Sequence, residues 1–183
     1  MGKKIIVLII ILLILGGGFF YWWRWQADVR VLNKGLPGGV RVAKSFGGQY
    51  KVNNKKDGYV VKVPESLQKI QEVEYKELGG DQLAILENEI GIEGENGLLA
   101  ISYIKPKEAY VSLGSFVEDW SKVYMPTGKQ NKEKIGNFDI IQVRGEERYG
   151  DLKFYFLETD SKVYKVSLLS EEFVKEIILK SEW

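Results

Sequence analysis

The feature that most constrains this chain is an uninterrupted apolar run close to its N-terminus. Residues 5–15 read IIVLIIILLIL, eleven aliphatic residues in succession, and no charged residue occurs in the nineteen positions from Ile5 to Trp23. As an α-helix, these positions span roughly 29 Å at ~1.5 Å per residue, which matches the ~30 Å hydrocarbon thickness of a bilayer. A helix in the core of a soluble protein keeps a polar face, and this run has none. The sequence therefore predicts a transmembrane helix.

The residues on either side of the run agree with a spanning helix. Lys3 and Lys4 place positive charge on the short side, and Arg24 lies among the aromatic residues that follow. Trp and Tyr side chains favour the level of the lipid headgroups. We therefore assign residues 1–26 to a membrane anchor, with Lys3, Lys4 and Arg24 as the charges that influence its topology. The anchor positions are Ile5, Ile10, Leu15, Phe19, Phe20, Trp22, Trp23 and Trp25.

Cleavage and orientation of this segment have to be considered separately. A cleaved signal peptide needs small residues before the cleavage site, and bulky aromatic residues stand at positions 19–23 instead, so an uncleaved anchor is favoured. Basic residues occur on both sides of the run, so the positive-inside rule nearly balances. We expect a cytoplasmic N-terminus and an extracytoplasmic domain, because a charged start before a strong apolar run is the usual export signal. A domain that faces the cytoplasm is the alternative.

The sequence changes character twice after the anchor. Residues 27–56 contain five glycines and Pro37, a density that interrupts regular structure. We predict a solvated juxtamembrane linker here. Short strands, or contact of its basic residues with anionic headgroups, are the alternatives. Residues 57–183 have the patterning of a globular domain.

The pattern from residue 57 onward is typical of an α+β domain. Polar residues 87–97 are interpreted as a hairpin turn and residues 65–70 as a helical turn, whereas Ser115 with Glu118 forms a capping-box pattern and Ser170 an N-cap. Because the strands do not alternate with helices, we expect a mostly antiparallel sheet packed by two or three helices. About seven strands are predicted, at residues 59–63, 72–77, 83–86, 98–104, 140–143, 152–157 and 163–169.

The composition removes several classes of chemistry. The chain has no cysteine and no histidine, which excludes a thiol nucleophile, a zinc-thiolate site and a histidine general base. Residues 27–183 carry 23 basic and 25 acidic residues, which argues against a nucleic-acid partner. The best metal candidates are Glu87, Glu89, Glu93 and Glu95, but their spacing fits no calcium loop and predicts side chains that face water. We expect no cofactor and no metal.

Four segments together resemble the PsbP-like family of α/β/α domains. They are residues 58–66 (GYVVKVPES), residues 113–120 (LGSFVEDW), residues 135–157 with their IGNFD and YFL stretches, and residues 162–183 with KVYKVS and a final helix. The resemblance implies a non-enzymatic domain that binds or stabilises a larger assembly. It departs from the family where Leu67 and Ile70 stand in place of a Trp after Pro64, and in having a membrane anchor. No functional residue is carried over.

These observations lead to one functional expectation and one alternative. We expect a membrane-anchored, extracytoplasmic binding or scaffolding domain without catalytic activity, whose partners are the lipid bilayer and a protein of a membrane-associated assembly. The alternative is a small membrane-tethered hydrolase that uses Ser/Lys or carboxylate chemistry. A concave pocket with convergent Ser, Lys and acidic side chains would favour the hydrolase.

Overall fold

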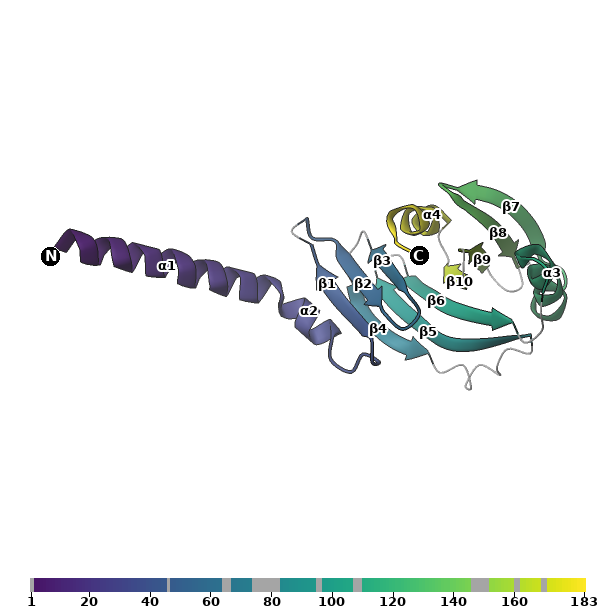
Figure 1. Ribbon diagram of the computed structural model, residues 1–183, viewed down its shortest axis with the longest axis horizontal. Coiled ribbons are helices and arrows are strands. Elements are labelled where there is room, and N and C mark those ends of the chain that lie inside the picture. Colours follow the sequence, from purple (N-terminus) through teal and green to yellow (C-terminus); the bar gives the residue numbers. More distant parts are fainter. Residues whose placement is uncertain are drawn as a thin grey trace. The chain divides into compact units, whose positions relative to one another are not determined.

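The computed structural model (Figure 1) describes residues 2–45, 47–63, 67–73, 83–94, 97–106, 110–145, 152–159, 162–168 and 171–183. These residues fall into two units, Met1–Gly35 and Leu36–Trp183, and each is described by itself. The first unit is helical, and the second contains two antiparallel sheets and two helices. The α+β class predicted from the sequence is therefore confirmed.

The first unit contains two consecutive helices. Helix α1 (Gly2–Trp25) includes the whole apolar run, as predicted. A short helix α2 (Ala27–Leu32) follows it. Helix α2 ends at Asn33, whose backbone N–H and side-chain amide both donate to the carbonyl of Val29, at 3.0 and 2.7 Å. These two bonds satisfy a carbonyl that the end of the helix would otherwise leave unpaired.

The second unit is organised around a seven-stranded antiparallel sheet with the order β4-β5-β6-β10-β9-β8-β7. Strands that follow one another in the chain are neighbours in the sheet, except for β6 and β7, which are separated because β10 inserts between β6 and β9. This insertion joins two halves of the sheet that are far apart in sequence. The strands are β4 (Leu67–Val73), β5 (Ala84–Gly94), β6 (Gly97–Pro106), β7 (Lys129–Ile135), β8 (Phe138–Arg144), β9 (Lys153–Glu158) and β10 (Val163–Leu168).

Helix α3 (Leu113–Tyr124) covers one face of this sheet. Its Trp120 ring lies 5.1 Å from the ring of Phe154 and 5.0 Å from that of Phe156, both on β9. The predicted capping box is shifted by one turn: Ser112 is the N-cap and exchanges hydrogen bonds with Ser115. The core beneath α3 consists of Ala84, Ile104, Phe116, Val117, Trp120, Met125, Ile141, Val143 and Phe156.

Helix α4 (Glu171–Lys180) packs on the opposite face. Successive residues of a strand point to opposite sides, and Lys153, next to Phe154, forms an ion pair with Glu171 of α4 at 3.1 Å. The predicted helix at this place is confirmed, whereas its predicted N-cap, Ser170, lies outside the described residues. The four buried apolar residues of α4 are Phe173, Val174, Ile177 and Ile178, as its sequence spacing predicts.

A separate three-stranded sheet precedes the large one in the chain. Strands β1 (Val40–Lys44), β2 (Tyr50–Asn54) and β3 (Tyr59–Val63) pair in sequential antiparallel order (Figure 1). Its inner face packs on the same side of the large sheet as Tyr164, whose ring lies edge-on to Tyr59 at 5.8 Å. Residues 181–183 close the free side of β3, because the backbones of Val60 and Glu182 exchange hydrogen bonds of 2.7 and 2.9 Å.

The predicted linker over residues 27–56 is wrong for most of its length. Residues 36–56 belong to the folded unit, and only residues 27–35 belong with the anchor. Alternate side chains of β1 and β2 are buried, among them Val40, Val42, Tyr50 and Val52. Of the glycines that suggest a linker, Gly47 and Gly48 lie in the turn between β1 and β2, and the other three precede β1. The segment folds despite its glycines because its short apolar stretches share one face.

Three further predictions are corrected. The predicted helical turn at residues 65–70 is instead strand β4 from Leu67 onward. The predicted turn over residues 87–97 is mostly strand, since β5 extends to Gly94 and pairs residue by residue with β6. The charged strand β7 was not predicted, and the described residues contain ten strands where about seven were expected. Of the strand predicted at residues 72–77, only residues 72 and 73 are described, at the end of β4.

Candidate functional site

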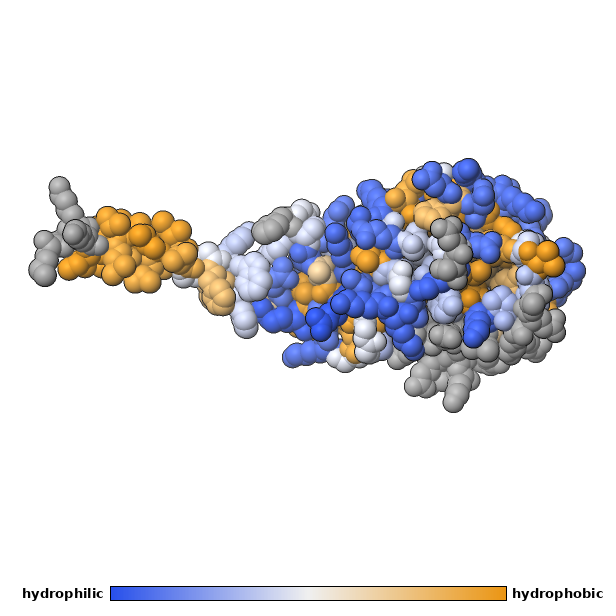
Figure 2. Space-filling model, viewed as in Figure 1, coloured by the Kyte–Doolittle hydropathy of each residue, from blue (hydrophilic) through white to orange (hydrophobic). Residues whose placement is uncertain are grey.

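The first candidate for a functional region is the apolar surface of α1. Residues Ile5–Trp25 form a helix long and apolar enough to cross a membrane, and none of these residues is buried. The predicted anchor residues Ile5, Ile10, Leu15, Phe19, Phe20, Trp22 and Trp23 are exposed and Trp25 is half-buried. Figure 2 shows the corresponding hydrophobic surface. Lys3 and Lys4 lie in α1, but their side chains are outside the description, whereas Arg24 is exposed at its C-terminal end.

The aromatic end of α1 is a connected group of rings. The ring of Phe19 lies 6.1 Å from Trp22 and 6.2 Å from Trp23. The guanidinium of Arg30 stacks 3.7 Å from the Trp23 ring centroid and donates a 2.8 Å hydrogen bond to the Trp23 carbonyl. A tryptophan stacked on an arginine presents both an apolar body and a positive charge, which suits the level of the lipid headgroups.

The second candidate is a buried polar cluster formed by Glu89, Ser102 and Lys165. These residues occupy directly paired positions on β5, β6 and β10, so their side chains share one face of the sheet. Their exposed fractions are 8, 0 and 3 %. The Ser102 hydroxyl donates to Oε2 of Glu89, and Lys165 Nζ lies 3.7 Å from the same oxygen.

Aromatic rings surround the ammonium group of this cluster. Lys165 Nζ lies 6.0 Å from the Trp120 ring centroid and 5.8 Å from that of Phe154. The faces of these rings carry partial negative charge, and together with the Glu89 carboxylate they offset the cost of burying an ammonium group. The predicted exposure of Glu89 is therefore wrong, because helix α3 covers the face to which it points.

The cluster contains the side chains that a Ser/Lys hydrolase uses, but they are not arranged as a serine nucleophile beside its base in a substrate-accessible site. A serine nucleophile has to be activated by a base and has to reach a substrate. The Ser102 hydroxyl is hydrogen-bonded to a carboxylate and is fully buried, and none of the three residues lines the groove described below. Among the described residues, no group of three or more acidic side chains could hold a metal ion. The cluster as folded is a buried ion pair with its hydrogen bond.

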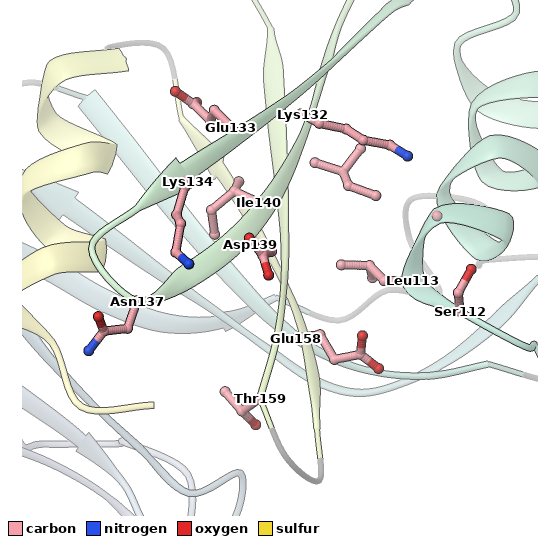
Figure 3. Close-up of a pocket in the computed structure, with 12 residues that line it drawn as sticks. Ser112, Leu113, Lys132, Glu133, Lys134, Asn137, Asp139, Ile140, Glu158 and Thr159 are labelled. Carbon is pink, nitrogen blue, oxygen red and sulfur yellow. The ribbon is translucent and has the colours of Figure 1, made fainter.

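The third candidate is an open groove of about 810 Å³ beside the N-terminal end of α3 (Figure 3). The hairpin of β7 and β8 forms one wall, and the end of β9 forms the other. Figure 3 shows Glu133 pointing away from the groove, where its carboxylate forms a 3.0 Å ion pair with Lys175 of α4. The other charged residues that line the groove are Lys132, Lys134, Asp139 and Glu158.

The two hydroxyl groups of this groove are engaged in local structure. Ser112 accepts a 3.2 Å hydrogen bond from the Ser115 backbone as the N-cap of α3. Thr159 donates to the carbonyl of Lys162 at 3.3 Å in the turn before β10. The groove thus presents charged side chains of both signs along an open surface.

Comparison with known proteins adds no further constraint: no family model, no curated protein and no solved structure matches the chain. The resemblance to the PsbP-like family accordingly stays a prediction.

Sequence reasoning missed Lys165 altogether and misplaced Glu89. One signal was present for each. Lys165 lies between Tyr164 and Val166 in an apolar strand, and Glu89 alternates with Ile90 and Ile92 in a run long enough for a strand. A charged residue in such a pattern is buried only if both faces of the sheet are covered, and the sequence pattern of one strand does not report that.

Proposed function

We propose that this protein is a single-pass membrane protein whose domain binds or scaffolds a protein of a membrane-associated assembly without catalysing a reaction. The observation that carries the proposal is the apolar helix from Ile5 to Trp25, none of whose residues is buried, followed after α2 and a short connection by a folded unit. An apolar surface of this length is costly in water, and a bilayer is the environment that removes the cost.

The side chains of the domain support binding over catalysis. Its Ser/Lys/Glu cluster is enclosed beneath α3, and the groove beside the N-terminal end of α3 is open and lined by charges of both signs. Such a groove is the kind of surface that a polar protein segment would contact. PsbP-like domains would be expected to act in the same way, by binding within a larger assembly.

A membrane-tethered hydrolase is the second candidate, since Ser102 and Lys165 lie side by side on paired strands. Conversion of Ser102 to Ala distinguishes the two. We expect Ser102→Ala to change stability while leaving association with membrane partners intact. Loss of a hydrolytic activity of the full-length protein toward ester or amide substrates in Ser102→Ala would establish the hydrolase instead.

We further propose that the N-terminus is cytoplasmic and the domain extracytoplasmic. The opposite orientation has its own support, because basic residues are more numerous after the helix than before it. The absence of cysteine allows a direct test. Val111 is 99 % exposed, so Val111→Cys gives one thiol that a membrane-impermeant maleimide labels in intact cells if the domain is outside. Labelling only after lysis would show a cytoplasmic domain.

Membrane anchoring is tested by alkaline carbonate extraction of the full-length protein. We expect the wild type to stay in the membrane pellet, and Ile10→Lys, which places a charge at the helix centre, to be extracted. Val31→Lys, outside α1, is the matched control and is expected to remain in the pellet. Cross-linking in intact membranes followed by native electrophoresis then tests the assembly, and a wild-type protein that migrates only as an isolated chain would refute it.

A further inference from the structure

The charges of this chain are separated along its sequence. Residues 1–63 carry eleven Lys and Arg against two Asp, whereas residues 64–183 carry fifteen Lys and Arg against 23 acidic residues. The overall charge of +1 hides this separation. The boundary falls at the end of β3, so the whole three-stranded sheet lies on the basic side.

The folded sheet collects these charges on its outer face. Register pairs Arg41 with Asn53 and Lys51 with Lys62, and the alternation of the strands places all four on the side opposite the buried valines. Arg41 and Lys51 are exposed, and so are Lys55 and Lys56 in the turn between β2 and β3. We call these five basic residues, Arg41, Lys51, Lys55, Lys56 and Lys62, the basic face.

Few acidic residues accompany the basic face in the sequence. Asp57 is the one acidic residue between positions 36 and 63, and it is 1 % exposed and bonded to Asn54 at 2.6 Å. Glu182 reaches Lys62 at 3.4 Å from the C-terminal segment. Lys51 lies directly opposite Lys62, and like charges at paired positions destabilise a sheet.

We propose that the basic face of the three-stranded sheet binds anionic lipid headgroups of the bilayer in which α1 is anchored. The inference rests on the proposed membrane anchoring. Its physical basis is the short connection: residues 33–39 join α2 to β1, and seven residues span at most about 25 Å. The sheet is thereby held near the headgroups, where each Lys or Arg gains about 1 kcal/mol from an anionic surface.

Two other anionic partners have weaker support. A nucleic acid would have to reach a face that is tethered beside the membrane, and the aromatic side chains of this sheet, Tyr50 and Tyr59, are buried rather than available for stacking on bases. An acidic protein remains a distinct outcome of the test. Anionic lipid is favoured because the covalent connection keeps it at high local concentration.

The experiment uses the full-length protein in lipid vesicles. Asn53→Cys places a unique thiol on the basic face for a polarity-sensitive fluorophore, and Val111→Cys carries the same fluorophore on the acidic part of the unit as a reference. We expect the label at position 53 to shift to the blue and become protected from iodide in vesicles with 30 % phosphatidylglycerol. Pure phosphatidylcholine or about 0.5 M salt should reverse the change, because salt screens these charges.

Two charge-matched variants test the residues. Arg41→Gln/Lys51→Gln/Lys55→Gln removes three positive charges from the basic face and keeps the pair of Lys62 with Glu182. Lys129→Gln/Lys132→Gln/Lys134→Gln removes three from the exposed strand β7. We expect the variant of the basic face to lower the ratio of docked to undocked label about 100-fold, because three residues each lose about 1 kcal/mol of attraction to the anionic surface. The β7 variant should leave this ratio unchanged.

The outcomes separate this inference from the anchoring on which it rests. Lipid docking would be refuted if the two triple variants responded equally. It would also be refuted, with the anchor still valid, if the label at position 53 did not respond in a protein that resists carbonate extraction. Extraction of the wild type by carbonate would refute the anchor itself. A shift in phosphatidylcholine vesicles on addition of polyglutamate, without a shift from anionic lipid, would assign the basic face to an acidic protein instead.

Discussion

The hydroxyl group of Tyr164 donates a 2.7 Å hydrogen bond to the backbone carbonyl of Asp57, across 107 residues of sequence. Tyr164 is in β10 of the large sheet, and Asp57 is in the turn between β2 and β3. Lys162 Nζ donates to the same carbonyl. Asn54 shapes this turn by accepting from the Asp57 backbone at 3.1 Å. The two sheets of the unit are thus joined at a buried carbonyl group, not only by apolar packing.

Removal of this hydroxyl should weaken the junction. We expect Tyr164→Phe to lower the free energy of unfolding by about 1 kcal/mol, the usual net value of a buried hydrogen bond, measured by urea denaturation. Tyr103→Phe, whose ring lies 6.1 Å from that of Tyr164, is the control and should cost less. An unchanged unfolding midpoint in Tyr164→Phe would show that the junction is held by packing alone.

The same tyrosine should make stability fall at high pH. Burial raises the pKa of Tyr164 from 10.0 to about 12, with the Asp57 carboxylate and Tyr103 acting in the same direction. Between these two values the folded state holds a proton that the unfolded state has released, so stability is present below pH 10 and is lost as pH rises toward 12. Burial also raises the pKa of Tyr59. We expect Tyr164→Phe to flatten the stability curve above pH 10.

Glu171 should contribute to stability at the acid end. Hydrogen bonds from Lys175, at 2.9 Å, and from Lys153, at 3.1 Å, lower the pKa of Glu171 from 4.5 to about 2. A lowered pKa adds stability that is present above pH 4.5 and lost as pH falls toward 2. Because Glu171 is 39 % exposed, solvent and salt screen the effect. We expect Lys175→Met to raise the pKa of Glu171 in an NMR titration, and Lys180→Met on the same helix to leave it unchanged.

The buried pair of Lys165 and Glu89 is suited to a double-mutant cycle. We expect Lys165→Met to lower the free energy of unfolding by about 3 kcal/mol or more, because it leaves a buried carboxylate without its ammonium partner. Glu89→Gln in the same chain should recover part of that loss, since it removes the unpaired charge. Additive effects of the two substitutions would mean that the pair is not coupled.

Trp183 should stabilise the contact between the small sheet and the end of the chain. Its ring lies 5.9 Å from that of Tyr59 and 5.4 Å from that of Tyr164, and its Nε1 donates to the Ile178 carbonyl at 3.2 Å. We expect Trp183→Ala to cost about 2 kcal/mol, measured by urea denaturation. Glu182→Ala, which keeps the backbone bonds to Val60, should cost less than 1 kcal/mol. Equal losses would show that the ring adds nothing.

Several elements of the fold are predictable from short stretches of sequence. The strands at residues 59–63, 83–86, 98–104 and 140–143 were placed correctly, because β-branched residues and alternation are local properties. Strand β7 has no such pattern: its residues are mostly Lys, Gln, Asn and Glu. Among the strands that the structure describes, it lies at the edge of the sheet and pairs with β8. Charged residues are tolerated there because an edge strand with lysines resists pairing with other chains.

The candidate sites depended on information that no short stretch contains. The net charge of residues 27–183 does not reveal the basic face, because it combines the positive charge of the small sheet with the negative charge of the remaining residues. The five residues of the basic face meet only when β1, β2 and β3 pair. In the sequence, four of them lie within the glycine-rich segment 27–56, where a linker is predicted, and nothing local indicates that they share a surface.

By itself, the sequence determined the apolar helix, since the run of uncharged side chains from Ile5 to Trp23 has the same hydrophobicity whatever surrounds it. Tertiary structure alone decided which charged residues are buried and which are presented to solvent. Glu89 is enclosed because helix α3 and strands from 13 and 76 residues further along the chain surround it, whereas Lys51 is exposed on the outer face of its sheet. The environment of a charge is set by its neighbours in space, and those neighbours are supplied by distant segments.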